Sequence, residues 1–544
     1  MKASDRIINE ILNKRGITDE DEIREFMSDK PQKTYDPFLL LNMKEGVDLL
    51  LSEIKKGTKI CIYGDYDADG VTSVCILSNA LRMLTDNFTY YIPSRFEEGY
   101  GLNKSAIKKI KDQGTGLIVT VDCGSVSYDE VEYAKKLGIR MIVTDHHSID
   151  DIKADCILIN PKQEGCTYPF KELAGCGIAF KMVQAIRKRE NLPKSVVTEV
   201  LDLAAVGTVG DIVSLRDENR TIVKYGLNKI NTGNRRALRC LKDRISLNVV
   251  TSENIAFGIA PHINAAGRLS HASEAAELFL TDDYEVMCEK TEKLVQLNAE
   301  RKRLQEEAYR RCVSMISGTE NFIVLRVDGI HEGIAGIVAG KIKENYDRPV
   351  IILTVSGEGF LKGTGRSVQS VDIYKTLKRH DELFERFGGH RSACGLLMKE
   401  EKLEELRTAM NEEIDAMLAA DPDLFKQNVI WDCEISPEDI TMELADALNK
   451  LEPFGQDNPR PILLMKNVGI KDVKLMGSDE THARFNVVSQ SGYTAECVLF
   501  QRAQELRNIL FSNGKVDITG TINIKKWNGR KYPQFITEEV YPCR

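Results

Sequence analysis

The sequence predicts an α/β protein with a parallel-sheet domain, a long helix that joins it to a second αβ domain, and a C-terminal β-barrel. Three observations predict this class. Short apolar runs alternate with amphipathic stretches between about 50 and 145, a pattern typical of right-handed βαβ units. Residues 282 to 316 contain neither Pro nor Gly and are densely charged, which favours one long, exposed linking helix. Beyond about 430, short strand-like runs separated by turns predominate and indicate a barrel.

At 544 residues the chain is long enough for about three or four domains with substantial cores. A small helical segment that ends at Asp36-Pro37 is expected first, and the linking helix is expected within a helical connector. The predicted boundaries are 1–48 for the helical lead-in, 49–240 for the parallel-sheet domain, 241–316 for the connector, 317–428 for the second αβ domain and 429–544 for the barrel.

The individual elements follow from apolar runs and from helical periodicity. In the barrel region, helices are expected only near 436–450 and 500–511. The other expected elements are strands at 59–63, 117–121, 140–144 and 156–160, helices at 71–84 and 103–113, and strands at 322–327 and 350–354 in the second domain.

Four acidic clusters each follow a run that we predict as a buried strand. Because ligands bind outside the carboxyl ends of parallel strands, carboxylates at these ends should converge in one crevice. Such concentrated negative charge is unstable unless a cation lies among it. Carboxylates with one or two imidazoles suit Mn²⁺ or Mg²⁺, and two such ions about 3.5–4 Å apart suit phosphoester hydrolysis. The clusters are Asp65-Tyr-Asp67-Ala-Asp69-Gly70, Val121-Asp122-Cys123-Gly124, Thr144-Asp145-His146-His147 and Gly210-Asp211-Ile212-Val213.

Each cluster taken alone has another interpretation. Asp-x-Asp-x-Asp-Gly also suits a calcium loop or a helix cap. The calcium loop needs a Glu seven residues after Asp69, however, and the chain has Ile76 there. Asp122 could be a turn residue, and Asp211 could cap a helix. Adjacent His146 and His147 should point to opposite faces of an extended strand end, so that one binds a metal while the other turns to the substrate.

Composition places weaker limits on function. A net charge of −8 argues weakly against a nucleic-acid partner, but metal-binding carboxylates inflate the acidic count. The thirteen cysteines show no Cys-x-x-Cys spacing, which favours reduced thiols in a cytoplasmic protein over zinc sites or disulfides. The N-terminus lacks an apolar signal core, and no stretch is long enough to cross a membrane.

Asp145-His-His147, with the other three clusters in this order, resembles the DHH phosphoesterase superfamily. Within it, the whole chain is similar to the exonucleases that degrade single-stranded DNA from the 5′ end. The similarity extends through Ile159-Asn-Pro-Lys162, Leu173-Ala-Gly-Cys-Gly177, Asn264-Ala-Ala-Gly-Arg268, Gly388-Gly-His390 and Leu451-Glu-Pro-Phe-Gly455.

This resemblance implies a ligand set for two metal ions. Asp65 and Asp122 would hold one ion, and Asp67, Asp122, His146 and Asp211 the other, with Asp122 bridging. The implied chemistry is attack by an activated water on phosphorus. Relatives such as the manganese pyrophosphatases place a histidine four residues before the first Asp, where this chain has Cys61. The first ion is therefore expected to have fewer protein ligands and to bind more weakly.

The catalytic group implied by the same resemblance contains three further residues. His147 would contact the scissile phosphate rather than a metal. Asp69 and Asp145 would orient the metal ligands by hydrogen bonds.

Gly388-Gly389-His390 belongs, by the same resemblance, to a DHHA1-type domain. Gly-Gly alone permits a tight turn before a strand, whereas the functional interpretation is close backbone approach to a phosphate with His390 as donor. Arginine suits phosphate because its planar fork donates two hydrogen bonds, although a surface salt bridge is the alternative for each arginine. Further candidates for gripping a 5′ end are Arg95, Arg268, His331, Thr364, Arg366 and Ser367.

The C-terminal domain contains a basic and aromatic run, Lys525-Lys-Trp527-Asn-Gly-Arg530-Lys-Tyr532-Pro-Gln-Phe535. Asn-Gly between two alternating runs predicts a β-hairpin. Basic residues interleaved with aromatic rings are typical of an OB-fold surface that binds single-stranded nucleic acid. In such a platform the cations contact phosphates and the rings stack on bases. The alternative is that the aromatic rings pack the barrel; we favour it for Phe535 and favour stacking for Trp527.

The resemblance thus implies an exonuclease that hydrolyses single-stranded DNA from the 5′ end with two Mn²⁺ or Mg²⁺ ions, releasing 5′-mononucleotides in repair and recombination. The resemblance implies a cytoplasmic monomer that works with a single-strand-binding protein and a helicase. One alternative is a phosphodiesterase for short oligoribonucleotides or cyclic dinucleotides, although such relatives lack the barrel. Another is a catalytically silent nucleic-acid scaffold. The choice between Mn²⁺ and Mg²⁺ stays open.

Overall fold

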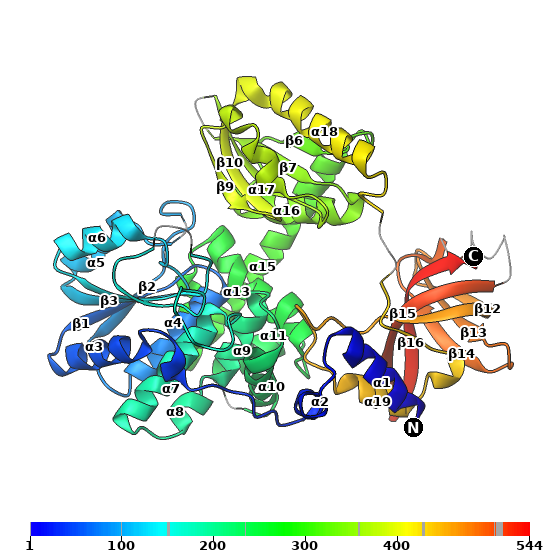
Figure 1. The fold of residues 1–544 in the computed structure, drawn as a ribbon, viewed down its shortest axis with the longest axis horizontal. Helices are drawn as coiled ribbons and strands as arrows, with labels where there is room; N and C mark the ends of the chain where they lie inside the picture. The colour runs from blue at the N-terminus through cyan, green and yellow to red at the C-terminus, as the bar shows by residue number, and fades with distance from the viewer. Residues whose placement is uncertain are drawn as a thin grey trace. The chain divides into compact units, whose positions relative to one another are not determined.

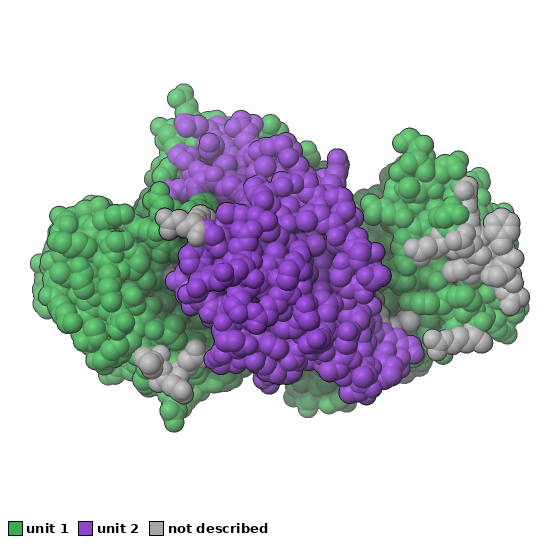
Figure 2. Space-filling model, turned by 90° about the horizontal axis from the view of Figure 1, so that it is seen from above, with its two compact units in different colours: residues 1–261, 276–287, 429–544 green, residues 262–275, 288–428 purple. Residues whose placement is uncertain are grey.

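The computed structural model describes residues 2–99, 101–149, 153–233, 235–356, 359–426, 430–504, 506 and 515–543. The chain divides into two compact units, coloured separately in Figure 2. Unit 1 comprises residues 1–261, 276–287 and 429–544, and unit 2 comprises residues 262–275 and 288–428. The predicted linking helix is confirmed as α15, Tyr284–Val313, which begins in unit 1 and continues into unit 2.

Unit 1 contains the predicted parallel sheet, with strands in the order β2-β1-β3-β4-β5. Figure 1 labels β1, β2 and β3 of this sheet. All neighbouring strands run parallel. The strands are apolar because helices cover both faces of the sheet. They are β1 (Lys59–Tyr63), β2 (Phe88–Tyr91), β3 (Thr115–Val121), β4 (Arg140–Thr144) and β5 (Ile157–Ile159).

Helices lie on each face of this sheet. On one face, Ala106 and Ile107 of α5 and Val131 of α6 share a core with Cys61 and Ile118 of the strands. On the other face, α3 packs so tightly that a Cβ on its Gly46 would come within 2.8 Å of Ile159. These layers are formed by α3 (Met43–Lys55), α4 (Ala68–Leu81), α5 (Lys104–Asp112), α6 (Tyr128–Lys136) and α7 (Gly175–Glu190).

A helical region follows the sheet. The segment Ile255–Ile259 is a π-helix (η2) between two α-helices, which a sequence pattern of period 3.6 does not reveal. The α-helices of the region are α8 (Ser195–Thr198), α9 (Leu201–Gly210), α10 (Asp217–Thr232), α11 (Arg236–Arg244), α12 (Ser252–Asn254), α13 (Ala260–Leu269) and α14 (Ser273–Leu280).

Unit 2 is built on a mixed sheet with strands in the order β6-β7-β8-β10-β9. The strand pair β6–β7 is parallel, and the remaining pairs are antiparallel. One face packs on α17 and α18 and the other on α15 and α16. The elements are β6 (Ile323–Arg326), α16 (Glu332–Tyr346), β7 (Val350–Val355), β8 (Phe360–Arg366), α17 (Ile373–Lys378), η3 (Asp381–Leu383), β9 (Arg386–His390), β10 (Ala393–Lys399), η4 (Glu400–Lys402) and α18 (Leu403–Ala420).

The C-terminal part is the predicted β-barrel. The strand order β12-β13-β14-β16-β15 closes because β12 also pairs with β15. A helix was predicted near 436–450, and α19 forms there; of the stretch predicted at 500–511, residues 505 and 507–511 lie outside the described residues. The elements are β11 (Cys433–Glu434), η5 (Pro437–Asp439), α19 (Met442–Asn449), β12 (Leu463–Met476), β13 (His482–Val488), β14 (Thr494–Leu499), β15 (Lys515–Trp527) and β16 (Arg530–Pro542).

The two N-terminal helices, α1 (Ala3–Lys14) and α2 (Glu20–Met27), complete the hydrophobic core of this barrel. Their side chains Ile7, Ile11 and Phe26 are buried against residues such as Leu448 and Phe485. The beginning of the chain therefore belongs to the same core as its last described part.

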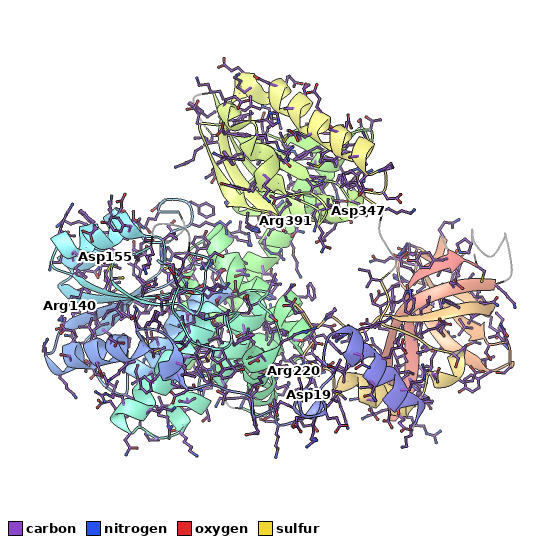
Figure 3. The ribbon with its side chains drawn as sticks, viewed as in Figure 1. Asp19, Arg140, Asp155, Arg220, Asp347 and Arg391 are labelled. Atoms are coloured by element: carbon purple, nitrogen blue, oxygen red, sulfur yellow. The ribbon has the colours of Figure 1, made fainter. Side chains whose placement is uncertain are left out.

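Residues 28–36 lead from α2 to the sheet domain and are fastened to it by polar contacts. Thr34 donates a hydrogen bond to Glu218 (2.7 Å), and the buried Lys181 donates to both Glu218 (2.7 Å) and the Tyr35 carbonyl (2.6 Å). Arg220 of α10, labelled in Figure 3, donates to the carbonyl oxygens of Phe26 and Leu451. These bonds connect the sheet domain to the barrel within unit 1.

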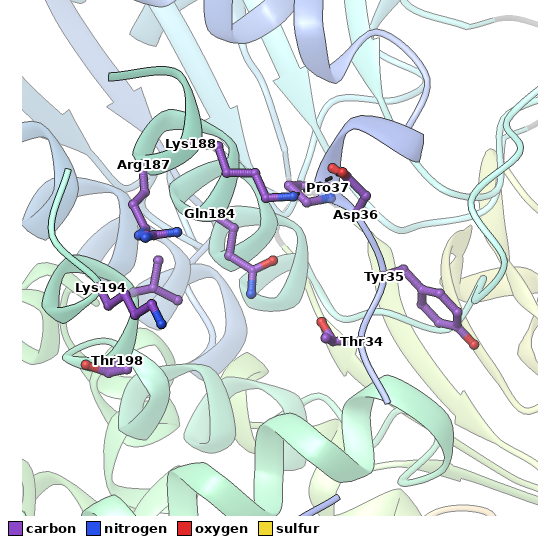
Figure 4. A pocket seen from close by; sticks show the side chains of 10 residues that line it. Thr34, Tyr35, Asp36, Pro37, Gln184, Arg187, Lys188, Lys194 and Thr198 are labelled. Atoms are coloured by element: carbon purple, nitrogen blue, oxygen red, sulfur yellow. Dashed lines mark ion pairs between the residues drawn. The ribbon is translucent and has the colours of Figure 1, made fainter. Parts of the chain in front are cut away.

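Residues 34–37 also form one wall of a cavity of about 400 Å³. The other walls come from α7 and from residues 194–198, and Lys188 forms a 3.0 Å ion pair with Asp36 across it (Figure 4). None of the predicted site residues lines this cavity. Among the described residues, no helix combines the length and apolarity needed to span a membrane.

Candidate metal centre and nucleic-acid surfaces

Three of the acidic clusters follow parallel strands, as predicted. Asp65 and Asp67 come after β1, Asp122 comes directly after β3, and Asp145 comes directly after β4. The register aligns the ends of these strands, since Tyr63 pairs with Thr120 and Val121 with Thr144. The carboxylates therefore meet at one edge of the sheet.

The prediction that Asp211 also ends a strand is wrong. Asp211 is the C-cap of helix α9, Leu201–Gly210, which is buried along most of its length. A short segment that is apolar on every side lacks the periodicity that separates a buried helix from a buried strand. The alternative that Asp211 caps a helix is confirmed, and it caps the carboxyl end.

The side chains of the four clusters form one constellation. The His146 Nε2 atom lies 3.2 Å from Asp122 Oδ1, 3.4 Å from Asp211 Oδ2 and 3.9 Å from Asp69 Oδ2. Three sets of ligand atoms each lie within 4.8 Å of one another: Asp65, Asp67 and Asp122; Asp69, His146 and Asp211; and Asp122, His146 and His147. The geometry therefore groups Asp67 with Asp65 and Asp122, whereas the resemblance placed it with His146 and Asp211.

Several of these atoms are buried without a hydrogen-bond partner. They are Asp65 Oδ1, Asp122 Oδ1, Asp211 Oδ2 and both ring nitrogens of His146. A buried polar atom without a partner is costly, and five such atoms in one place are the donor set that a hard divalent cation requires. The residues present thus fit a Mn²⁺ or Mg²⁺ centre.

The protonation equilibria of the cluster agree with this fit. Burial, together with the charges of neighbouring carboxylates, raises the pKa of Asp65 and Asp122 well above 3.8 and that of Asp211 to about 9. Burial also lowers the pKa of His146 to about 4, so the imidazole is neutral and able to bind a metal. In the protein alone, Asp211 therefore retains a proton near neutral pH, which a cation would displace.

Asp69 and Asp145 hold the constellation in place. Both oxygens of Asp69 accept backbone hydrogen bonds from the first turn of α7, from Gly175 (2.7 Å) and Cys176 (2.8 Å). Asp145 accepts from the backbone N–H groups of Ser125, His146 and His147. These bonds fix two carboxylates that the sequence assigned to orienting roles.

The two histidines differ in exposure but do not point to opposite faces. The chain bends at His147, and the two rings lie 4.4 Å apart at 54°. The His147 side chain is 44% exposed, and its Nδ1 lies 2.7 Å from Asp145 Oδ1. Although burial lowers the pKa of His147, the hydrogen bond and charge of Asp145 outweigh burial, and the pKa is raised. The prediction of alternating faces fails because the strand ends at Thr144.

Glycines beside the cluster were missed as site residues. A Cβ on Gly175 would come within 2.5 Å of Asp122 Oδ1, and a Cβ on Gly207 within 2.9 Å of Asp69 Oδ1. Asp122 itself has a φ of 64°, a conformation that costs energy in a non-glycine residue. The available signal was glycine inside apolar runs, which often marks a close approach of backbone.

Cys61 joins none of these three groups. The thiol is buried in β1, and burial raises its pKa to about 12. A protonated, buried thiol is a poor ligand for a hard cation.

Arg95 lies near the metal cluster in unit 1. Its guanidinium is 5.0 Å from the centre of the Tyr66 ring, and its positive charge is one of the influences that favour the ionised form of Asp65. The structure therefore places this predicted phosphate ligand beside the first carboxylate cluster.

Unit 2 gathers a second group of predicted residues around the start of α16. His331 is the N-cap and accepts from the backbone of Gly333, and Arg268 donates to the Gly333 carbonyl (3.1 Å). Arg366 donates to Thr364 (3.3 Å), and a Cβ on Gly336 would come within 2.9 Å of the Arg366 guanidinium. The Arg366 guanidinium can therefore lie against α16 because Gly336 has no side chain.

Ser367 and the glycine pair differ from their predicted settings. Ser367 is buried, and its hydroxyl donates to the Val371 carbonyl (2.8 Å), so it closes a turn. Gly388 and Gly389 lie inside strand β9 with exposed His390 at its end, so the alternative of a tight turn before a strand is wrong. A Cβ on Gly389 would collide with the Ala393 carbonyl.

The predicted hairpin forms between β15 and β16, where Trp527 pairs with Arg530 across Asn528-Gly529. Both loop residues have positive φ, 47° and 74°, as a type I′ turn requires. Trp527 is 63% exposed and Tyr532 43% exposed, whereas Phe535 is fully buried in the barrel. The prediction that Phe535 packs inside the barrel is confirmed.

Three family models match the chain. Residues 59–208 match the DHH family, N-terminal domain; residues 319–416 match the DHHA1 domain; and residues 431–539 match the RecJ OB domain. Together with the carboxylate and imidazole cluster, these matches define the DHH class of phosphoesterases with an added OB domain.

Individual proteins are similar over almost the whole chain. The single-stranded-DNA-specific exonuclease RecJ of Bacillus subtilis is 37% identical over 98% of this chain and 68% of its own length. The Salmonella typhimurium protein of the same name is 36% identical over 92% of this chain and 91% of its own. The crystal structure of Thermus thermophilus RecJ with Mn²⁺ matches with a TM-score of 0.84 and 27% identity over 98% of this chain and 75% of that one. The chain belongs to the RecJ family.

Proposed function

We propose that this protein is a metal-dependent exonuclease that hydrolyses single-stranded DNA from the 5′ end and releases 5′-mononucleotides. The observation that carries the proposal is the set of buried, unpartnered carboxylate and imidazole atoms at the edge of the parallel sheet. Curated relatives named as single-stranded-DNA-specific exonucleases support the substrate.

Asp65, Asp67 and Asp122 would hold one ion, and Asp122, His146 and Asp211 a second, with Asp122 shared. The Thermus thermophilus relative was solved with Mn²⁺ and with Mg²⁺, which supports both metals as candidates. When bound, such ions lower the pKa of water and neutralise charge on phosphate oxygens.

The chain's own residues would bind and orient the substrate. His147 is half-exposed and its Nδ1 is held by Asp145, so its Nε2 would donate to the scissile phosphate. Its raised pKa favours the doubly protonated ring that this donation needs. Asp69, which accepts hydrogen bonds from the first turn of α7, would help to orient His146.

Recognition of the 5′ end would come from arginine and from backbone donors. Arg95 lies beside the first carboxylate cluster, and Arg268, His331, Thr364 and Arg366 surround the start of α16 in unit 2. A terminal phosphate carries more charge than an internal diester and binds such groups better. Exposed Gly388, Gly389 and His390 would approach the strand backbone, and Ser367 would support the turn beside Arg366.

We also propose the domain boundaries predicted above, a cytoplasmic monomer, and action in repair and recombination beside a single-strand-binding protein and a helicase. The names of the curated relatives support the single-stranded substrate on which such partners act.

The test is incubation of a single-stranded forty-mer, labelled at either end, with Mn²⁺ or Mg²⁺. We expect release of labelled mononucleotide from the 5′ end in either metal and none after chelation. A duplex of the same sequence is the control and should resist. Removal of the 5′-phosphate should slow the first cleavage more than later ones, because each cut regenerates a 5′-phosphate. Erosion from the 3′ end, or cleavage of dinucleotides alone, would contradict the proposal and favour a small-substrate phosphodiesterase.

A further inference from the structure

Phe257 presents its ring to solvent from the π-helix η2, and the side chain is 83% exposed. A single exposed apolar residue needs no explanation. Here, however, the exposure coincides with a π-helical turn, and such turns are frequent at functional sites.

The support beneath the ring is rigid. Ile255 and Ile259, at the two ends of η2, are fully buried. Thr251 and Asn254 form a capping box before the turn, and the Ser252 hydroxyl donates to the Phe454 carbonyl (2.6 Å). The ring of Phe257 is thus held outward by a fixed backbone.

This support adjoins the metal cluster. Gly210, the last residue of α9, lies between Ala68 and Ala260, because a Cβ added to it would be 3.1 and 3.3 Å from their Cβ atoms. Ala68 follows Asp67, Ala260 follows η2, and Asp211 follows Gly210. Phe257 therefore lies three residues before Ala260, which packs against Gly210, and Gly210 directly precedes Asp211.

A second exposed apolar side chain comes directly after Asp211. Ile212 is 70% exposed and has a φ of 60°. For a β-branched residue this left-handed conformation is a genuine outlier, and such strain persists where the surrounding structure enforces it, often at ligand sites. Two exposed apolar side chains thus lie within three residues of the contact between Gly210 and Ala260.

We infer that Phe257 and Ile212 form an apolar step that receives an unpaired nucleobase of the substrate strand next to the scissile phosphodiester. The inference rests on the proposed function, since it names the part of that substrate which the ring contacts. Aromatic rings stack on bases of any identity, but only bases that are free of a complementary strand offer an open face. The step would therefore add selection for single strands while remaining indifferent to sequence.

The first test compares Phe257→Ala and Phe257→Trp, with Met83→Ala as a matched control. Met83 is also exposed (59%) and apolar, but it follows the far end of α4. We expect Phe257→Ala to raise KM for a forty-mer about 5- to 150-fold with a smaller change in kcat. Phe257→Trp should retain KM, and Met83→Ala should change neither constant. Thermal unfolding of each variant reports its folding.

The second test locates the base by moving one abasic site along the first nucleotides of the strand. In the wild type, one position should raise KM as much as Phe257→Ala does. In Phe257→Ala, an abasic site at that position should not raise KM further, because the contact that it would remove has already been lost with the ring. Ile212→Gly should weaken binding at the same position, with a smaller effect.

Outcomes that overturn the inference differ from those that overturn the proposed function. If the wild-type protein binds the strand without degrading it, the proposed function is contradicted but the inference is not. The abasic scan can then be carried out by measuring binding affinity instead of hydrolysis. Equal KM for wild type and Phe257→Ala, or equal abasic sensitivity at every position, contradicts the stacking step alone. A wild type that self-associates while Phe257→Ala is monomeric would assign the ring to contact between copies and would also overturn the inference.

Discussion

The metal cluster and the hairpin of β15 and β16 belong to the same unit but are built in opposite ways. In the cluster, Asp65, Asp122 and His146 are buried, and their atoms lack partners within the protein. In the hairpin, Trp527 and Tyr532 are exposed at the end of a two-stranded ribbon. Buried charges depend on one another and on a cation, whereas exposed groups act almost independently. We therefore expect all-or-none effects in the cluster and graded, nearly additive effects in the hairpin.

The largest effect is expected from Asp122→Ala. Mutation of a residue that only hydrogen-bonds to a metal ligand lowers metal affinity or activity by about 10- to 100-fold. Loss of the shared ligand itself should therefore lower the rate of hydrolysis by more than about 100-fold. Without metal, the variant should be at least as stable as the wild type, because one buried carboxylate is gone. Nuclease assays and thermal unfolding with and without Mn²⁺ check both points. Continued stabilisation of Asp122→Ala by Mn²⁺ would contradict the assignment.

A severe but distinct effect is expected from the two histidines. His146→Ala should weaken metal binding, because it removes the buried imidazole between Asp122 and Asp211. His147→Ala should leave metal binding nearly intact and lower kcat, because its ring is half-exposed and hydrogen-bonded to Asp145. Calorimetric titration with Mn²⁺ separates the two. Loss of a metal in His147→Ala but not in His146→Ala would show that the roles are inverted.

The stability of the metal-free protein should depend on pH through Asp211. Burial raises its folded pKa to about 9 from an ordinary 3.8. A carboxyl group with a raised pKa stabilises the folded state below the unfolded pKa, and this stability is lost as pH rises through the folded value. The melting temperature without metal should therefore fall between about pH 4 and pH 9, and Mn²⁺ should oppose the fall. Asp211→Asn should flatten the dependence; an unchanged slope would refute this explanation.

The sequence predicted the strand ends of the cluster well because apolar runs followed by Asp65, Asp122 and Asp145 are local patterns. It also predicted the hairpin, because Asn528-Gly529 sets the turn by its own backbone preferences. It failed at Asp211, since a helix that is apolar all round has no period to read. It could not predict that α1 and α2 complete the barrel core, because contacts between residues more than 400 positions apart leave no local pattern.

A moderate effect is expected from Trp527→Ala. If the exposed indole stacks a base, binding of a forty-mer should weaken by about 1–3 kcal/mol, independently of base identity. Hydrolysis of very short oligonucleotides should be unchanged, because the hairpin belongs to the barrel and the metal cluster to the sheet domain. Truncation of the barrel is a poorer test, because it would expose the core that α1 and α2 share with it. Unchanged forty-mer affinity in Trp527→Ala would contradict the platform.

The smallest effects are expected from the hairpin cations, and the structure ranks them. Lys525 lies 3.3 Å from Glu496, so part of its charge is already neutralised. Lys526 and Lys531 face each other across the exposed ribbon, and Arg530 is also exposed. Each lysine or arginine that contacts a phosphate releases counter-ions, about 0.7 per contact on a single strand. Lys526→Ala should therefore reduce the slope of log affinity against log salt by up to about 0.7, and Lys525→Ala by less.

Both variants remove one lysine from the same strand of the hairpin, on opposite faces of the ribbon. Replacing Lys526, Arg530 and Lys531 together should reduce the salt slope nearly as the sum of the single changes, as expected for exposed and independent charges. Equal salt slopes for Lys525→Ala and Lys526→Ala would show that the ion pair between Lys525 and Glu496 breaks when the strand binds. A salt slope that none of these changes alters would remove the hairpin from the path of the strand and leave single-strand binding to the sheet domain and unit 2.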